Sequence, residues 1–285
     1  MMDTDYLGYA RRGLTAWWRY PVAACLGVLL AIVLGAVGLL VAGLLHLAPP
    51  DLATQVQHPD HPATFFLVTA FMFGLMVVGF ALAIRWLHRK RFGDILGAWT
   101  WRQYLLGFGV WIPVLVVTAL IDFALAPSGF KFTGGTHLVS LTALALAALA
   151  VQTFAEEFVF RGYLTQGLML ATKQPLVAAL ISGLLFGSIH IPNGIPQAAS
   201  ATVFGVVMAL IAIRTGGIAF TSGLHLANNL FAAVVLVSSN DAFKGSPGLF
   251  SQDTPQLMWW DAIAGGVALA LVAFVLMWRR RAIRA

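Results

Sequence analysis

The 285-residue sequence has one cysteine, Cys25, and very few charged side chains. A single cysteine excludes an internal disulfide and any metal cluster built on several thiolates. Charged residues make up 10% of the chain and hydrophobic residues 60%, and the mean hydropathy is +0.86. Because soluble domains carry about 25% charged residues, this composition predicts a polytopic membrane protein and excludes a soluble enzyme or nucleic-acid-binding domain.

Long apolar runs fill most of the chain. We expect spans at about 22–47, 64–84, 104–126, 138–171, 176–190, 197–213, 217–238 and 258–278. The fold class that follows is all-α, a membrane helix bundle of about eight transmembrane helices. We divide the chain into an N-terminal region (1–137) with a basic interfacial start, a core (138–240), and a last span with a basic tail (241–285).

The basic residues are distributed very unevenly over the predicted loops. With eight spans, every Lys and Arg except Lys131 and Lys244 falls on the side of both termini. The positive-inside rule then predicts cytoplasmic termini, with loops 48–63, 127–137 and 239–257 outside. The net charge of +6 therefore needs no nucleic-acid partner, because anionic lipid headgroups of the bilayer suffice.

Glutamate is nearly as scarce as cysteine, since Glu156 and Glu157 are the only two in the chain. They lie inside an apolar run, where a carboxylate is costly unless it is paired or faces water. Four residues separate Glu157 from Arg161, so the two share a helix face and predict an ion pair. Glu156 points away from that face and is free to reach a cavity.

Two histidines in later spans are candidate partners for Glu156. Glu156 and His190 lie 17 residues before and after Lys173. In antiparallel helices they reach the same depth. His225 lies in another span, and Asn229 follows one turn later on the same face.

Two further positions carry weaker expectations. The segment 191–196, Ile-Pro-Asn-Gly-Ile-Pro, cannot continue a regular helix. We favour a break at membrane depth lining a cavity over an ordinary outer loop. Asp122, near the outer end of its span, is expected to contact headgroup water.

Three motifs in this order carry a family resemblance: Glu156-Glu157-x-x-x-Arg161, Phe186-x-x-x-His190 and His225-x-x-x-Asn229. They resemble the EExxxR, FxxxH and HxxxN motifs of the CAAX prenyl protease 2 and bacteriocin-processing enzyme (CPBP, or Abi) family. The resemblance covers about residues 140–235. It implies an intramembrane endopeptidase in which Glu156 and His190 activate a water and His225 and Asn229 stabilise the oxyanion. Glu157, Arg161 and Phe186 would support the site.

The residue types agree with peptide hydrolysis. A glutamate can take the proton of a water, and His and Asn can donate to an oxyanion. The same residues could instead hold a divalent metal such as zinc, with ligands among Glu156, His190 and His225. We favour the reaction that needs no cofactor, because the set is a poor zinc cage once Glu156 serves as base.

Two other functions stay open from the sequence. The first is a proton-coupled transporter that uses Glu156, His190 and His225 as a relay. The second is a non-catalytic membrane scaffold or immunity protein. The protease is preferred because all three motifs are intact. Its substrate is a membrane-associated or lipidated peptide or protein, and its location is an integral protein of the bacterial plasma membrane.

Overall fold

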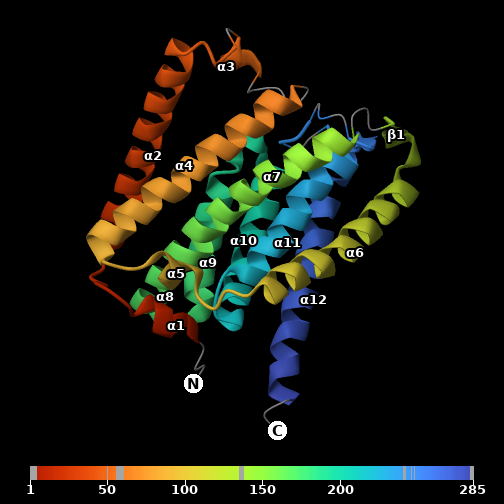
Figure 1. The fold of residues 1–285 in the computed structure, drawn as a ribbon. Coiled ribbons are helices and arrows are strands. Elements are labelled where there is room, and N and C mark those ends of the chain that lie inside the picture. Colours follow the sequence, from red (N-terminus) through yellow and green to blue (C-terminus); the bar gives the residue numbers. More distant parts are fainter. Residues whose placement is uncertain are drawn as a thin grey trace.

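The computed structural model describes residues 5–49, 51–55, 61–134, 138–239, 242–244, 246 and 248–282 and is a bundle of helices (Figure 1). Parts of the three predicted outer loops and the end of the basic tail lie outside these residues. The main helices are α2 (Arg19–Leu44), α4 (Pro62–His88), α6 (Trp101–Leu125), α7 (Leu138–Glu157), α9 (Pro175–Ser188), α10 (Ile195–Thr215), α11 (Ala219–Leu230) and α12 (Met258–Ala282).

The predicted fold class is confirmed, since a helix lies at each of the eight expected positions. Six helical segments are long and apolar enough to cross a membrane. The other two, Pro175–Ser188 and Ala219–Val235, are shorter apolar helices. At 1.5 Å per residue, the 14 residues of α9 span only about 21 Å. The hydrocarbon core is about 30 Å thick, so α9 falls short of it.

Shorter elements connect the long helices. On the side of the termini these are α1 (Asp5–Ala10), α5 (Phe92–Leu96) and α8 (Thr165–Thr172). Helix α8 continues α7 through a π-helical stretch, η2 (Phe158–Leu164), as expected for a run that stays helical to about residue 171. The remaining ones are α3 (Leu52–Gln55), the turns η1 (Pro127–Gly129), η3 (Ile191–Asn193) and η5 (Pro255–Leu257), and the π-helical η4 (Phe231–Val235).

The helices pack in a sequence that leaves α2 and α12 on the outside. Helix α2 packs on α4, α4 on α7, α7 and α6 on α11, and α10 on both α9 and α12 (Figure 1). Glycines permit close approaches between packed helices. A Cβ added to Gly205 of α10 would lie 2.8 Å from the Cα of Gly183 in α9. This close contact brings the end of α9, where His190 follows, against the centre of the bundle.

A small sheet joins the loops at the end of the bundle away from the termini. Its strands are β1 (Phe130–Phe132), β2 (Leu236–Ser238) and β3 (Phe250–Gln252), in the order β1-β3-β2. Strand β3 pairs antiparallel with β1 and parallel with β2. We call this end of the molecule the sheet end.

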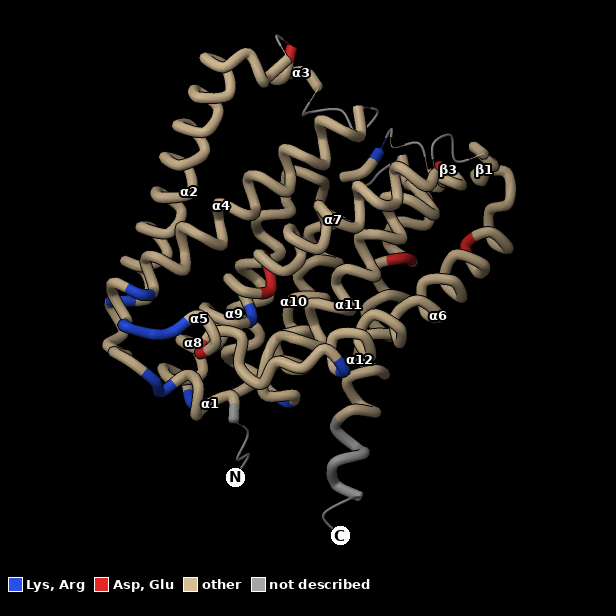
Figure 2. The backbone as a smooth tube through the Cα atoms, in the orientation of Figure 1, with Lys and Arg blue, Asp and Glu red and all other residues tan. Residues whose placement is uncertain are grey.

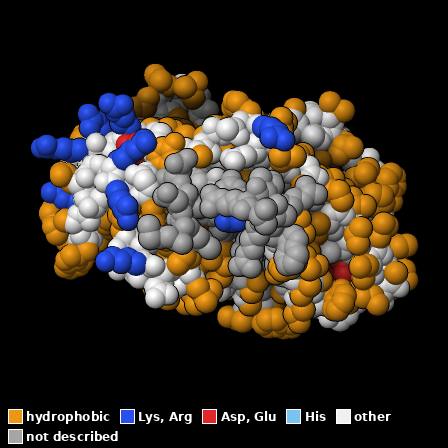
Figure 3. Space-filling view, turned by 90° about the horizontal axis from the view of Figure 1, so that it is seen from below, with side chains coloured by type: hydrophobic (Ala, Val, Ile, Leu, Met, Phe, Trp, Pro, Cys, Tyr) orange, Lys and Arg blue, Asp and Glu red, His pale blue; other side chains and the backbone are white. Residues whose placement is uncertain are grey.

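The opposite end carries both termini and most of the described Lys and Arg residues, and we call it the basic end (Figure 2). Figure 3, which views this end, shows basic side chains gathered on its surface. Two basic residues counted with it are buried instead. Arg161 is inside η2 and Lys90 is in the α4–α5 connection.

Lys90 fastens the N-terminal segment to the bundle. Its Nζ donates to the Ala10 carbonyl oxygen at 2.8 Å and to Gln166 Oε1 at 3.3 Å. Burial lowers the pKa of Lys90 to about 8, against the opposing effect of the Asp94 charge. In the same region Tyr6 is fully buried, and its hydroxyl donates to the Arg161 carbonyl oxygen. Helix α1 therefore packs on α8 and contacts η2 through Tyr6.

Candidate active site

The two glutamates end α7, and the π-helical stretch begins at the next residue. In this stretch the Thr165 amide donates to the carbonyl oxygen of Phe160, five residues back. Thr165 Oγ1 donates to the same oxygen at 2.7 Å. Tyr6 occupies the carbonyl oxygen of Arg161, as described above. Single π-turns occur frequently at functional sites, and here one sets the direction of Arg161.

Glu157 and Arg161 form the predicted ion pair. Glu157 Oε1 lies 3.1 Å from Arg161 Nη1, and both side chains are completely buried. The Arg161 guanidinium also lies over the ring of Phe186, 4.2 Å from its centroid. A buried charge needs a partner of opposite sign, so each of the two charges compensates the other in the centre of the bundle.

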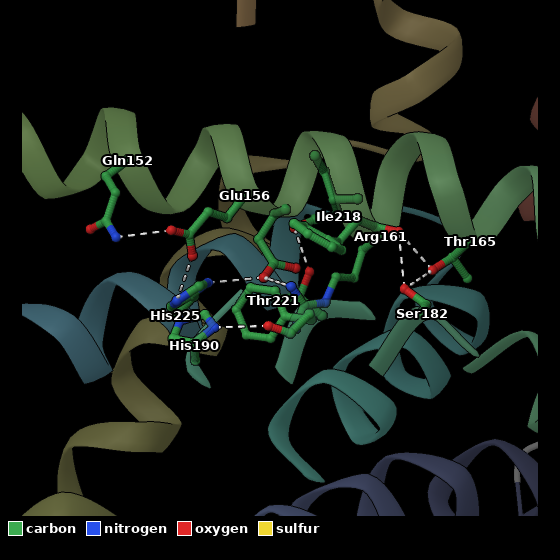
Figure 4. Close-up of polar contacts among 12 residues, drawn as sticks. Gln152, Glu156, Arg161, Thr165, Ser182, His190, Ile218, Thr221 and His225 are labelled. Carbon is green, nitrogen blue, oxygen red and sulfur yellow. Dashed lines mark hydrogen bonds and ion pairs between the residues drawn. The ribbon is translucent and has the colours of Figure 1, made fainter. Parts of the chain in front are cut away.

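His225 lies between the two glutamates, and Figure 4 shows it beside Glu156. Its Nδ1 is 3.0 Å from Glu157 Oε1, and its Nε2 is 3.5 Å from Glu156 Oε2. Because a carboxylate ion-paired with Arg161 accepts hydrogen bonds, Nδ1 carries a proton and donates to Glu157. Glu156 and Glu157 point in different directions from α7, because adjacent residues of a helix lie about 100° apart. Their carboxylates nevertheless reach the same imidazole from its two sides.

A chain of amide hydrogen bonds leads to the other oxygen of Glu156. Gln152 Nε2 donates to Glu156 Oε1 at 3.0 Å, and Gln152 Oε1 accepts from Asn229 Nδ2 at 3.3 Å. Asn229 Oδ1 accepts from Asn228 Nδ2 at 3.2 Å, and Asn228 Oδ1 accepts from Trp111 Nε1 at 3.1 Å. Four side chains from α6, α7 and α11 therefore fix the orientation of the Glu156 carboxylate.

His190 lies in the turn after α9, because the helix ends at Ser188 and not at about residue 190 as predicted. Its Nδ1 is 2.8 Å from the carbonyl oxygen of Phe186, which can only accept, so Nδ1 is the protonated nitrogen. In the neutral ring Nε2 is then an acceptor. The His190 ring also contacts Phe186, with the centroids 4.7 Å apart.

A cavity of about 580 Å³ connects these groups. Its lining includes Glu156, His190, His225 and Asn229, which are the four residues that the sequence nominated for chemistry. Phe186 also lines it, whereas Glu157 and Arg161 do not. The segment 191–196 contributes Asn193 and Pro196 to the wall, so the turn after α9 lines the cavity.

The part of the chain that holds this site is similar to a known protein family. A family model described as type II CAAX prenyl endopeptidase Rce1-like matches residues 138–231, which contain all three motifs. YyaK of Bacillus subtilis (strain 168), an uncharacterized protein, is 30% identical to this chain over 218 residues, which cover 72% of each protein. No solved structure matches the chain.

The chain belongs to the CPBP family. Membership implies an intramembrane protease of the CAAX-protease type at the level of the family. With six helical segments able to cross a membrane, it also makes this chain an integral membrane protein.

A divalent metal, which the CPBP family resemblance left open, does not fit the described residues well. Among them, no three His, Cys, Asp or Glu side chains converge as a possible metal site. Both nitrogens of His225 face carboxylates, and the protonated Nδ1 of His190 faces a backbone oxygen. The three ligands considered from the sequence, Glu156, His190 and His225, therefore do not form a three-ligand cage.

Several site residues of this CPBP protein were not found by sequence reasoning. Gln152 precedes Glu156 by one helical turn, and this i, i+4 spacing was the available signal. Trp111 and Asn228 have no comparable signal, because their contact joins α6 to α11 across 117 residues. Asp122 was expected at headgroup water, but its side chain is buried in the cavity wall and hydrogen-bonded to Asp261.

Proposed function

We propose that this protein is an intramembrane endopeptidase in which Glu156 activates a water to hydrolyse a peptide bond. The observation that carries the proposal is the position of the Glu156 carboxylate. It lines a 580 Å³ cavity together with His190, His225 and Asn229, and it is held between Gln152 and His225. A base that is fixed in orientation beside a space for substrate meets the geometric need of general base catalysis.

In the proposed reaction, Glu156 takes a proton from the water while the water oxygen bonds to the peptide carbonyl carbon. The carbonyl oxygen becomes an oxyanion, and the second proton of Asn229 Nδ2 is available to donate to it. His190 orients the water through Nε2, its acceptor nitrogen. The protonated Glu156 then gives its proton to the amide nitrogen, the C–N bond breaks, and an acid and an amine leave.

Charge balance favours a protonated His225 at the start of this reaction. Glu156 and Glu157 are two negative charges, and Arg161 with a protonated His225 supplies two positive ones. A cluster without net charge is the least costly state at membrane depth. Nε2 of the imidazolium then donates toward Glu156 or toward a developing oxyanion, as the sequence motif suggested for His225.

The substrate is a peptide or protein segment associated with the membrane. The test is comparative mass spectrometry of membrane peptides from cells that carry the wild-type protein or the Glu156→Gln variant. Peptides that depend on Glu156 are the expected result, and Glu157→Asp, which keeps the charge beside Arg161, is the matched control. If the two peptide populations are the same while the protein is present, it is not a protease.

A second measurement addresses the proposed absence of a required metal. We expect the purified, active protein to lack stoichiometric zinc and to keep its activity in the presence of a chelator. His225→Ala should reduce turnover by about 10²–10³ through the lost donor. Stoichiometric zinc that disappears in the His225→Ala variant, together with activity, would refute the metal-free mechanism.

A further inference from the structure

The cavity occupies only the half of the bundle that lies toward the sheet end. Helices α6, α9 and α11 run from the basic end to the sheet end, and they line the cavity with their later residues. Helices α4, α10 and α12 run the other way and line it with their earlier residues. Between Glu156 and Phe186, and between Phe204 and His225, no described residue lines it. Glu156 is therefore at the bottom of a space that extends toward the sheet.

Packed side chains fill the bundle between Glu156 and the basic end. The ion pair Glu157–Arg161 is fully buried and lies next to Glu156 on the side of the basic end. Below it lie further side chains that are buried and belong to η2, α8, α1, α5 and the start of α11, namely Phe158, Thr165, Gln166, Tyr6, Ile95, Ile218 and Thr221. This layer separates the cavity from the basic end.

The other end of the cavity has polar and exposed residues in its wall. Asn193, Ala242 and Asp261 line it and are exposed. The wall here also carries Asp122 and Asp261, and no described Lys or Arg lines it. These two carboxyl groups are hydrogen-bonded to each other, so they share a proton and carry one negative charge between them. The charge of Glu156 is balanced within its own cluster, so the net charge near this end is negative, which raises the local concentration of positively charged groups. The cavity thus disfavours an acidic segment.

We infer that the substrate reaches Glu156 from the sheet end, which the positive-inside rule places outside the cytoplasm. The inference rests on the proposed proteolysis and names its substrate class. This class is a peptide segment on the outer side of the membrane, or the outer end of a transmembrane segment, that is neutral or basic. The cytoplasmic tail of a lipidated protein does not belong to it.

Cysteine labelling tests this access without relying on activity. Cys25→Ser removes the chain's only cysteine, and Ser200→Cys then places one in the cavity wall. Ser238→Cys, on β2, is a second cavity position in case the first variant does not fold. A membrane-impermeant, cationic methanethiosulfonate is applied to right-side-out and to inverted membrane vesicles. We expect labelling of the cavity cysteine to be about tenfold faster, or more, in right-side-out vesicles.

Two matched positions calibrate the labelling. Gln174→Cys, exposed between α8 and α9 at the basic end, should react only in inverted vesicles. Ser182→Cys, buried against Thr165 in the packed layer, should react in neither. At the cavity position an anionic reagent of similar size should react about tenfold slower than the cationic one, after correction by the ratio at Gln174→Cys.

Faster labelling of the cavity cysteine in inverted vesicles, or no labelling in either, overturns the inference. Equal rates for both reagents overturn the part that concerns charge. Because none of these measurements uses proteolysis, they stand apart from the proposed function. Outer access together with unchanged membrane peptides in Glu156→Gln cells would leave this inference in place and remove only the protease.

Discussion

Two adjacent glutamates have different surroundings in this protein, although their side chains meet the same imidazole. Glu157 is fully buried against Arg161, whereas Glu156 lines the cavity. Removing one partner of a buried ion pair leaves the other charge uncompensated, at a cost of about 3–5 kcal/mol. We therefore expect the carboxylate of Glu157 to be needed for the fold, and that of Glu156 for the proposed reaction.

We predict that Glu157→Gln lowers the stability of the protein and that Glu156→Gln does not. The loss in Glu157→Gln should be about 3 kcal/mol or more, because Arg161 keeps its buried charge. Glu156→Gln should remain folded and lose proteolysis. Thermal unfolding in detergent and the amount of folded protein in the membrane measure the first effect, and release of Glu156-dependent peptides measures the second.

The double variant Glu157→Gln/Arg161→Met is the control for this prediction. It removes both charges, so it should be more stable than Glu157→Gln alone, as expected when two residues are coupled. An equal loss of folded protein from Glu156→Gln and Glu157→Gln would contradict the division between the two glutamates.

Gln152 is predicted to position Glu156 and to contribute less to the stability of the fold than Glu157 does. Gln152→Leu removes the hydrogen bond to Glu156 Oε1 and the acceptor of Asn229. We expect turnover to fall by about 10–100-fold, because a small misplacement of a catalytic group costs up to about this factor. The apparent substrate affinity should change little. Gln152→Glu, which keeps an acceptor for Asn229 but adds a negative charge, should not restore turnover.

Trp111→Phe is the matched change at the far end of the amide chain. It removes only the Nε1 donor to Asn228, so its effect on turnover should be in the same direction and smaller. If Gln152→Leu leaves turnover intact while Trp111→Phe reduces it, the hydrogen-bonded chain does not orient Glu156.

At the scale of elements, α1 and the α4–α5 connection support the π-helical stretch that carries Arg161. Tyr6 donates to the Arg161 carbonyl oxygen, and Lys90 links Ala10 to Gln166 of α8. A π-turn leaves backbone groups without their usual helical partner, and Tyr6 supplies one from 155 residues away. The N-terminal segment is thus part of the structure that holds the site.

Lys90 makes this attachment dependent on pH. Burial lowers its pKa in the folded protein from 10.5 to about 8. Between these values the unfolded chain binds a proton that the folded protein does not, so stability rises with pH. Below pH 8 both states are protonated, and the cost of burying the charge is fully present. Relative to Lys90→Met, wild-type stability should therefore rise from pH 8 to 10, by up to about 1.4 kcal/mol per pH unit.

Paired unfolding curves of detergent-solubilised wild type and Lys90→Met at several pH values measure this difference. Tyrosines that titrate in the same range affect both proteins and cancel in the comparison. If the difference in stability between the two proteins stays constant from pH 7 to pH 10, the pKa of Lys90 is not lowered in the folded protein.

The helices of this protein were predictable because membrane composition leaves few alternatives to apolar helical runs. The ion pair Glu157–Arg161 and the approach of His190 to the cavity were also predictable, since both follow from helical spacing. The π-helical stretch, the burial of Lys90 and the chain from Trp111 were not. Each depends on contacts between segments that are far apart in sequence, and no local pattern encodes them. The small sheet escaped prediction for the same reason.

For the whole molecule, the orientation in the membrane decides what kind of substrate the cavity can receive. Most of the described Lys and Arg residues gather at the end that holds both termini (Figure 2), and the cavity extends toward the other end. By the positive-inside rule, cytoplasmic termini and access to the cavity from outside go together. The opposite orientation would turn the same cavity toward the cytoplasm.

We therefore predict that reporter fusions at Asp51 and at the C-terminal Ala285 report opposite sides of the membrane, with Ala285 in the cytoplasm. Asp51 lies between α2 and α3, away from the basic end, and is exposed. Reporters active only outside the cytoplasm and only inside it should give complementary signals at the two sites. A fusion at Gln174, between α8 and α9, should agree with Ala285. If Asp51 and Ala285 report the same side, α2 to α12 do not cross the membrane eight times, and the cavity's outer access loses its basis.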